Sequence, residues 1–194
     1  MTDLVVGEDG LARCGWCVST PEYMAYHDDE WGRPVRDDRR LFEKISLEAF
    51  QSGLSWLTIL RKRDNFRAAF ADFDVAAVAA FTAGDRERLL ADVGIVRNRA
   101  KIDATLINAK AAAVLDVPLA ELVWRFAPDP DLRPAPRSLA DVPAKTAESV
   151  SLAKELKRRG FVFVGPTTMY ALMQAAGLVN DHLAECWVRD RDRA

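Results

Sequence analysis

The chain contains only two histidines, and both stand in segments that also hold cysteine. Cys14, Cys17 and His27 lie near the N-terminus, whereas His182 and Cys186 lie near the C-terminus. Thiolates and imidazoles are preferred zinc ligands, and a structural zinc site takes four of them in a tetrahedron. Four protein ligands leave no position for a catalytic water, so we expect one structural zinc ion that joins the two ends. The spacing leaves open whether Cys17 or His27 is the fourth ligand.

A second chemical feature is an acid within an apolar stripe. On a helix expected over 38–53, a turn of about 100° per residue places Glu48 roughly 20° from Leu41 and roughly 60° from Ile45. Glu43 falls on the opposite side, where we expect solvent. A carboxylate that faces inward must be paired, hydrogen-bonded or protonated, and such groups are often found where ligands are recognised. The alternative is an ordinary Glu that is salt-bridged to a neighbouring Arg.

Large aromatic residues flank this acid in the sequence. Trp16, Tyr23, Tyr26 and Trp31 precede it, and Trp56 follows it after a helix break. Aromatic faces beside a buried acid make a slot suited to a planar, hydrogen-bonding ligand such as a nucleobase. The alternative is that these side chains are plain core.

The segment at about 146–176 resembles a helix-hairpin-helix. Glycines allow a tight turn, Pro166 suits a first helical position, and the free N–H groups around Gly165 and Thr167 can face a DNA phosphate. The alternative is an ordinary helical corner or a short strand. Further positive side chains give modest support, although such runs are usually solvated surface; they are Arg61, Lys62, Arg63, Arg97, Arg99 and Lys101.

The composition is that of a soluble globular protein. The 194 residues are 49% hydrophobic and 29% charged, which excludes disordered, fibrous and collagen-like classes. The net charge of −2 does not by itself mark a nucleic-acid binder. The apolar stretches are too short to cross a bilayer and no secretory signal pattern is found, so we expect no membrane contact and a cytoplasmic location.

Periodicity predicts an all-α fold, because i, i+3, i+4 patterns recur from about residue 38 onward. The proline-rich stretch 127–143 is expected to be a connector, since it can sustain neither a helix nor a strand. The expected helices cover 38–53, 55–61, 64–70, 74–81, 85–91, 98–113, 118–124, 146–158, 166–176 and 179–187. On the last of these, His182 and Cys186 would share one face.

Taken together, the residues resemble the 3-methyladenine DNA glycosylase I family of the helix-hairpin-helix DNA glycosylases. The resemblance spans nearly the whole chain, and the terminal cluster combined with the Glu48 segment is its most specific part. The matching segments are Arg13-Cys14-Gly15-Trp16, Tyr23, Tyr26-His27-Asp28, Glu30-Trp31-Gly32, Leu47-Glu48, Gln51, Gly53-Leu54-Ser55-Trp56, Gly94-Ile95-Val96-Arg97, Phe163-Val164-Gly165 and Gly177-Leu178-Val179-Asn180-Asp181-His182.

For the fold, the resemblance implies one compact, two-lobed helical domain over residues 1–194. Its zinc-binding termini lie at about 13–32 and 178–188, and we expect a monomer. The zinc ligands implied by the resemblance are Cys14, His27, His182 and Cys186, which makes Cys17 a spare thiol.

For the function, the resemblance implies an enzyme that hydrolyses the N-glycosidic bond of 3-methyladenine in alkylated double-stranded DNA after flipping the base. Tyr26 and Trp56 would stack on the base, and Glu48, the catalytic residue, would hydrogen-bond its edge. Gly53 and Leu54 would occupy the gap left in the duplex. The remaining pocket walls would be Tyr23, Trp16 and Trp31, and the hairpin contacts to DNA would be Gly165 and Thr167.

Methylation at N3 makes adenine cationic and weakens its glycosidic bond, so a negative Glu48 among aromatic faces would prefer the damaged base to neutral adenine. No lysine is identifiable as a Schiff-base nucleophile, which predicts base removal without strand cleavage. Asp181 is the alternative catalytic residue, because many helix-hairpin-helix glycosylases carry an essential Asp near that position. The competing functions are a non-catalytic, zinc-stapled DNA-binding module and a zinc hydrolase.

Overall fold

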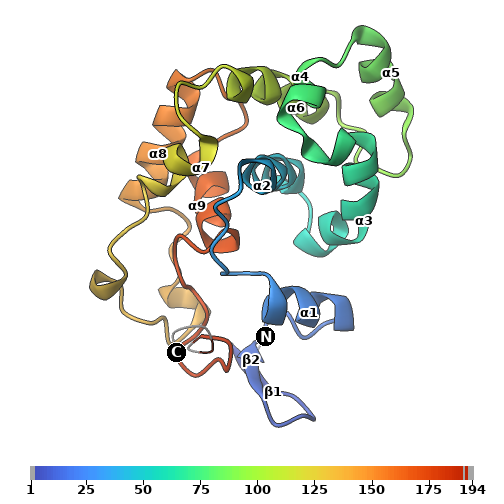
Figure 1. The fold of residues 1–194 in the computed structure, drawn as a ribbon. Helices are drawn as coiled ribbons and strands as arrows, with labels where there is room; N and C mark the ends of the chain where they lie inside the picture. The colour runs from blue at the N-terminus through green and yellow to red at the C-terminus, as the bar shows by residue number, and fades with distance from the viewer. Residues whose placement is uncertain (1–2, 190, 192–194) are drawn as a thin grey trace.

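The computed structural model describes residues 3–189 and residue 191, and over these residues the protein is mostly helical (Figure 1). None of the described helices is long and apolar enough to span a bilayer. Within the described part of the chain the α-helices are α1 (Pro21–Asp29), α2 (Asp38–Gln51), α3 (Trp56–Ala69), α4 (Val75–Ala79), α5 (Ala83–Ala91), α6 (Arg99–Ala113), α7 (Leu119–Trp124), α8 (Ala147–Arg158) and α9 (Pro166–Ala175). The expected helical class is therefore confirmed, apart from one small sheet near the N-terminus.

Helix α2 lies at the centre of the molecule and packs against α3, α6, α7 and α9 (Figure 1). It begins where the Asp37 side chain accepts a hydrogen bond from the Arg40 amide. Because neighbours surround it, every residue in the range 41–50 is buried. The prediction that Glu43 faces solvent is therefore wrong: its side chain is buried and pairs with Arg67 at 2.8 Å. Because α2 is enclosed along this stretch, a charged side chain there is stabilised by an ion pair, as Glu43 is by Arg67.

In the N-terminal half of the chain, the structure differs from the predicted helices at two places. The expected segments 55–61 and 64–70 form one continuous helix, α3, because nothing between them breaks a helix. Helix α1 was not expected from periodicity. Its signal is local: the Thr20 side chain accepts from the Tyr23 amide, and Pro21 occupies the first turn.

The described segments near the two ends of the chain lie together at the lower end of the molecule in Figure 1. Strand β1 (Leu4–Val6) pairs antiparallel with β2 (Ala12–Cys14). The helix expected over 179–187 is absent, and turns take its place. The backbone there bonds to other parts of the chain: the Trp187 amide donates to the Ala12 carbonyl at 2.9 Å, and the Ala184 amide donates to the Pro136 carbonyl at 2.8 Å. These tertiary partners replace the i to i−4 bonds of a helix.

In the connector and in the region of α8 and α9, the structure agrees more closely with the elements predicted from the sequence. Residues 127–143 contain only two short 3-10 turns, at Pro130–Leu132 and Leu139–Asp141. Helices α8 and α9 pack together on either side of a loop over residues 159–165. Gly165 is the N-cap residue of α9 and Pro166 is its first residue, as the sequence predicts.

Substitution of Gly177 tests how tightly the C-terminal segment is fixed. Gly177 has a φ of +73°, and an added Cβ would lie 2.5 Å from the Arg33 carbonyl carbon, so Gly177→Ala must move backbone. We expect a loss of at least about 3 kcal/mol in the free energy of unfolding, measured by urea denaturation. Gly10→Ala is the control, because Gly10 also has a positive φ (+76°) but open space around it, and should cost only about 1 kcal/mol. Equal losses would contradict this account.

Candidate active site and metal cluster

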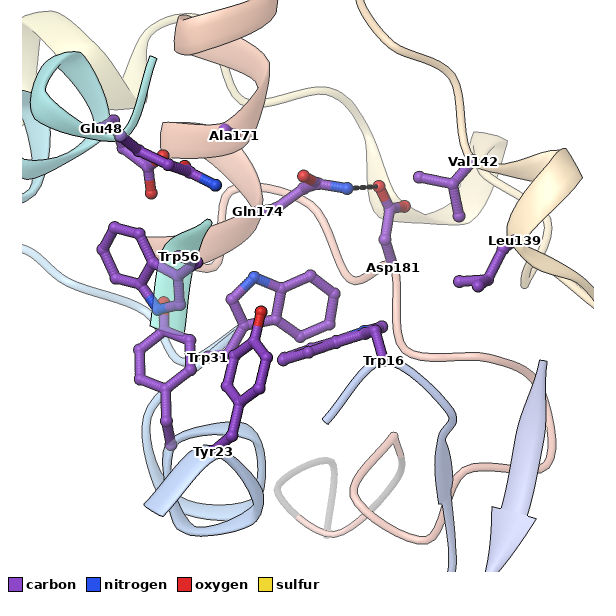
Figure 2. A pocket seen from close by; sticks show the side chains of 12 residues that line it. Trp16, Tyr23, Trp31, Glu48, Trp56, Leu139, Val142, Ala171, Gln174 and Asp181 are labelled. Carbon is purple, nitrogen blue, oxygen red and sulfur yellow. Dashed lines mark hydrogen bonds between the residues drawn. The ribbon is translucent and has the colours of Figure 1, made fainter. Parts of the chain in front are cut away.

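A cavity of about 240 Å³ lies between α1, α2, the start of α3 and α9 (Figure 2). It contains the side chains of all six residues that the sequence predicted for a base-binding pocket. These are Trp16, Tyr23, Tyr26, Trp31, Glu48 and Trp56. The structure thus collects in one place residues that are spread along the sequence from Trp16 to Trp56.

The aromatic rings form a continuous chain along the cavity wall. The Trp56 ring centroid lies 5.4 Å from that of Tyr26, which lies 6.5 Å from that of Tyr23. The Trp16 centroid follows at 4.9 Å from Tyr23, and the Trp31 centroid lies 5.1 Å from Trp16. Tyr23 and Tyr26 are three residues apart on α1, so both can reach the same side of that helix. Such a wall offers flat apolar faces to a planar ligand.

Glu48 enters this cavity from α2, beside the aromatic wall (Figure 2). Its side chain is buried, and none of the described residues donates a hydrogen bond or forms an ion pair with it. Burial raises the pKa of Glu48 to about 8, and the positive charge of Lys44 opposes this rise only in part.

The direction of this shift favours the protonated acid, one of the three states that the sequence analysis allows for an inward carboxylate. A cation placed in the cavity would favour the carboxylate and lower the pKa of Glu48. The acid therefore responds to the charge of what enters the cavity.

The indole nitrogen of Trp56 is a second unpartnered polar group in the residues that line this cavity. Its N–H is buried and has no hydrogen-bond partner among the described residues. Buried polar groups in folded proteins are nearly always paired, so each exception needs an explanation. The Trp56 ring lines the cavity, so the groups that a ligand there would meet are the aromatic faces and the carboxyl of Glu48.

Asp181, the alternative catalytic residue, also lines the cavity, but its environment differs from that of Glu48. The Tyr170 hydroxyl donates to it at 2.5 Å, Gln174 donates at 2.9 Å and Arg133 pairs with it at 2.9 Å. Figure 2 shows the bond from Gln174. Its oxygens are held by three protein donors, whereas those of Glu48 are not engaged by the described residues.

Sequence reasoning did not assign several other residues of the cavity. Leu139 and Val142 come from the proline-rich connector, where no periodic pattern marks an inward side. Ala171 and Gln174 lie three residues apart on one face of α9, and this spacing was the available signal. Gln51 completes the lining from the last turn of α2.

A groove of about 260 Å³ begins at Glu48 and reaches the residues predicted to contact DNA. Gly53, with a φ of +80°, and Leu54, whose side chain is 42% exposed, form the turn between α2 and α3 at this groove. Thr167, in the first turn of α9, lies across it, two residues beyond the N-cap residue Gly165. The structure therefore places the predicted DNA contacts beside the acid.

The predicted metal ligands form a buried cluster behind the aromatic wall. The ligand atoms of Cys14, His27, His182 and Cys186 all lie within 4.8 Å of one another. The two histidine nitrogens are 3.1 Å apart, and the Cys186 sulfur lies 3.5 Å and 3.7 Å from them. A tetrahedral zinc ion separates its nitrogen and sulfur ligands by roughly 3.3–3.8 Å. The two sulfur–nitrogen distances lie in this range and the nitrogen pair is slightly closer, so the donor set and its spacing suit that ion.

Other groups orient the two imidazoles. His27 Nδ1 lies 2.8 Å from an Asp28 carboxylate oxygen, and His182 Nε2 lies 3.1 Å from the Trp31 carbonyl. These contacts leave His27 Nε2 and His182 Nδ1 turned toward each other, which is the arrangement that metal-binding histidines use. Cys17 is buried but lies outside the group of four, so the geometry favours His27 as the fourth ligand.

The chain is similar in sequence and in structure to known proteins. A model of the methyladenine glycosylase family matches residues 16–190. The chain is 47% identical to DNA-3-methyladenine glycosylase 1 of Escherichia coli (strain K12) over 179 residues, which cover 91% of this chain and 96% of that protein. A crystal structure of 3-methyladenine DNA glycosylase I is 48% identical, with a TM-score of 0.85 and coverage of 90% of this chain and 98% of that one. A variant of such an enzyme in complex with 3-methyladenine is 32% identical, with a TM-score of 0.84 and coverage of 91% and 97%.

The raised pKa of Glu48 predicts a pH-dependent stability. Between its ordinary pKa of 4.5 and its folded pKa of about 8, the unfolded chain loses a proton that the folded protein retains. Below pH 4.5 Glu48 is protonated in both states and does not change the free energy of unfolding with pH. As pH rises from 4.5 toward 8, the free energy of unfolding falls by at most about 1.4 kcal/mol per pH unit.

We expect the unfolding free energy of the wild type to fall relative to that of Glu48→Gln between pH 5 and pH 8, because the amide that replaces the acid does not titrate. Urea denaturation of both proteins at several pH values measures this difference. Parallel curves over the whole range would show that burial does not perturb the acid.

Proposed function

This chain belongs to the methyladenine glycosylase family, and from that membership and the cavity we infer how it acts on DNA. It is a glycosylase that removes 3-methyladenine from DNA. We propose that it extrudes the damaged nucleotide from alkylated double-stranded DNA into the aromatic cavity, hydrolyses the N-glycosidic bond there, and leaves the strand intact.

The observation that carries this mechanism is the buried, unpartnered carboxyl of Glu48 beside five aromatic rings. Adenine methylated at N3 in DNA is a flat cation, and its charge favours the ionised form of Glu48. The aromatic faces, Tyr26 and Trp56 foremost, stack on the same base and add cation–π attraction. Undamaged adenine is neutral and would leave the acid protonated, so the cavity prefers the damaged base by charge as well as by shape.

Glu48 is the catalytic residue in this proposal. Positive charge develops on the sugar as the weakened bond breaks, and a carboxylate in a low-dielectric cavity stabilises that charge before water attacks. Asp181 instead anchors the wall, because Tyr170, Gln174 and Arg133 already hold its oxygens. The described residues that line the cavity include no lysine, which supports base removal without a Schiff base and without strand cleavage.

The duplex is held at the groove beside Glu48. Leu54 fills the gap left by the extruded nucleotide, and Gly53 allows the tight turn that presents it. The N-terminus of α9, around Gly165 and Thr167, binds a backbone phosphate through its free N–H groups. In this proposal residues 1–194 act as one monomeric domain, with the helix-hairpin-helix at about 146–176.

The four-residue cluster holds one structural zinc ion. Two thiolates and two imidazoles match the donors that zinc prefers, and four protein ligands leave no open position for water activation. This arrangement argues against a zinc hydrolase. The ion would join the N-terminal segment, about 13–32, to the C-terminal segment, about 178–188, behind Trp16 and Trp31.

Release of 3-methyladenine from methylated duplex DNA tests the role of Glu48. We expect Glu48→Gln to lower the single-turnover excision rate by about 100-fold, because the variant cannot form a negative charge beside the sugar. Trp56→Ala should lower it by at least about tenfold through loss of stacking. Duplex binding, measured by fluorescence anisotropy, should change little in either variant.

Glu121→Gln is the matched control, since Glu121 lies on the exposed surface of α7. An unchanged rate in Glu48→Gln would remove Glu48 from its proposed role. An inactive wild type that still binds duplex DNA would instead identify a non-catalytic binding module.

Metal analysis tests the zinc proposal. We expect one zinc ion per chain in the wild type and in Cys17→Ala, and none in Cys186→Ala, because Cys186 belongs to the cluster and Cys17 does not. Loss of the ion should lower the melting temperature by several degrees, since the site closes a loop between the two termini. Retention of zinc by Cys186→Ala, or its loss from Cys17→Ala, would overturn the ligand assignment.

A further inference from the structure

Helix α6 carries two buried polar side chains that bind the backbone of the two DNA-contacting loops. We define the insertion turn as residues 52–55 and the hairpin loop as residues 159–165. We propose that Lys101 and Asn108 make α6 a brace that fixes these loops relative to each other for engagement of duplex DNA. This inference rests on the proposed function, because it assigns the two loops to the DNA interface.

Lys101 holds the insertion turn. Its ammonium donates to the Phe50 carbonyl at 2.8 Å and to the Ser52 carbonyl at 2.5 Å, and the residue is only 7% exposed. Both acceptors lie where α2 ends, and the last carbonyls of a helix have no partner within the helix and carry partial negative charge. The buried cation therefore caps α2 and fixes the point from which Gly53 and Leu54 project.

Asn108 holds the hairpin loop. Its side-chain amide donates to the Val162 carbonyl at 3.0 Å and accepts from the Val162 amide at 2.8 Å. The next residue, Phe163, has a φ of +58° and a side chain that is 43% exposed. A left-handed backbone is rare for an aromatic residue and persists only where surrounding contacts impose it. The paired bonds from Asn108 supply that constraint.

The geometry of α6 sets the distance between Lys101 and Asn108. Lys101 and Asn108 are seven residues apart, which is about two turns or roughly 10.5 Å along one face of α6. Thr105 lies between them and is also buried, with its hydroxyl bonded to the Lys101 carbonyl. Because a helix is stiff over two turns, neither loop can shift without breaking buried hydrogen bonds.

A purely structural helix would not need these polar groups. Burial of an ammonium or an amide costs free energy unless its N–H groups find hydrogen-bond acceptors. Apolar side chains of similar size pack without that requirement. The polar groups bind backbone that must stay in place while Leu54 and Phe163 remain exposed. Exposed apolar side chains on a rigid support are suited to contact with a partner, and here the partner is the duplex.

The test compares duplex engagement with occupation of the cavity. The variants are Lys101→Met and Asn108→Leu, which remove the hydrogen bonds but keep similar volume. Lys110→Met, on the exposed face of α6, is the matched control. We expect both test variants to lower kcat/KM for excision from methylated duplex DNA by at least tenfold. Binding of free 3-methyladenine, followed by tryptophan fluorescence, should stay within twofold of the wild type.

A double-mutant cycle tests whether Lys101 affects excision through the insertion turn. If Lys101 acts through the insertion turn, Lys101→Met should reduce excision less than threefold when Leu54→Ala is already present. An equal reduction in both backgrounds would overturn the proposal, as would unchanged excision or a parallel loss of base binding. Should Lys101→Met fail to fold, Asn108→Leu combined with Phe163→Ala supplies the same cycle for the hairpin loop.

The outcome also separates this inference from the function on which it rests. Failure of the wild type to release 3-methyladenine would refute the proposed function. Normal release by the wild type together with wild-type rates in both α6 variants would refute only the brace.

Discussion

The cavity depends on keeping the carboxyl of Glu48 buried while none of the residues that the structure describes is paired with it. Burial raises the pKa of this acid to about 8, so the fold bears a cost that a paired acid would avoid. That cost is sustained because α2 is packed against other helices around Glu48 and cannot rotate the side chain into solvent. The same helix neutralises its other buried acid, Glu43, with Arg67. Of these two buried acids of α2, Glu48 is the one that no described residue pairs with, so it can respond to a ligand.

The metal cluster supports the cavity from behind. The Trp16 ring lies 5.2 Å from that of His27, and the Trp31 ring lies 4.7 Å from that of His182. The groups that hold the termini together therefore also hold two rings of the aromatic wall. The two histidines of the chain therefore contact rings of the cavity wall, whereas Glu48 and Trp56 reach the cavity from other elements.

Sequence patterns predicted most helices because periodic burial along one element is a local property. The prediction failed where tertiary partners replaced local ones. Residues 179–187 have the spacing of a helix, yet their backbone bonds to Ala12 and Pro136 instead. His182 and Cys186 still meet, but through turns. The connector likewise gave no sign that Leu139 and Val142 would close the cavity, because proline-rich segments carry no periodicity that marks an inward side.

By itself the sequence determined the chemistry available: three cysteines and two histidines near the ends, an acid on an apolar helix face, and aromatic residues around it. Residue type and short-range spacing set these properties. Only the tertiary structure decided which groups are partnered. It left Glu48 without a partner among the described residues, gave Asp181 three donors, and turned Lys101 from an expected surface charge into a buried cap. Partnership depends on contacts between residues distant in sequence, and those contacts exist only once the helices have packed.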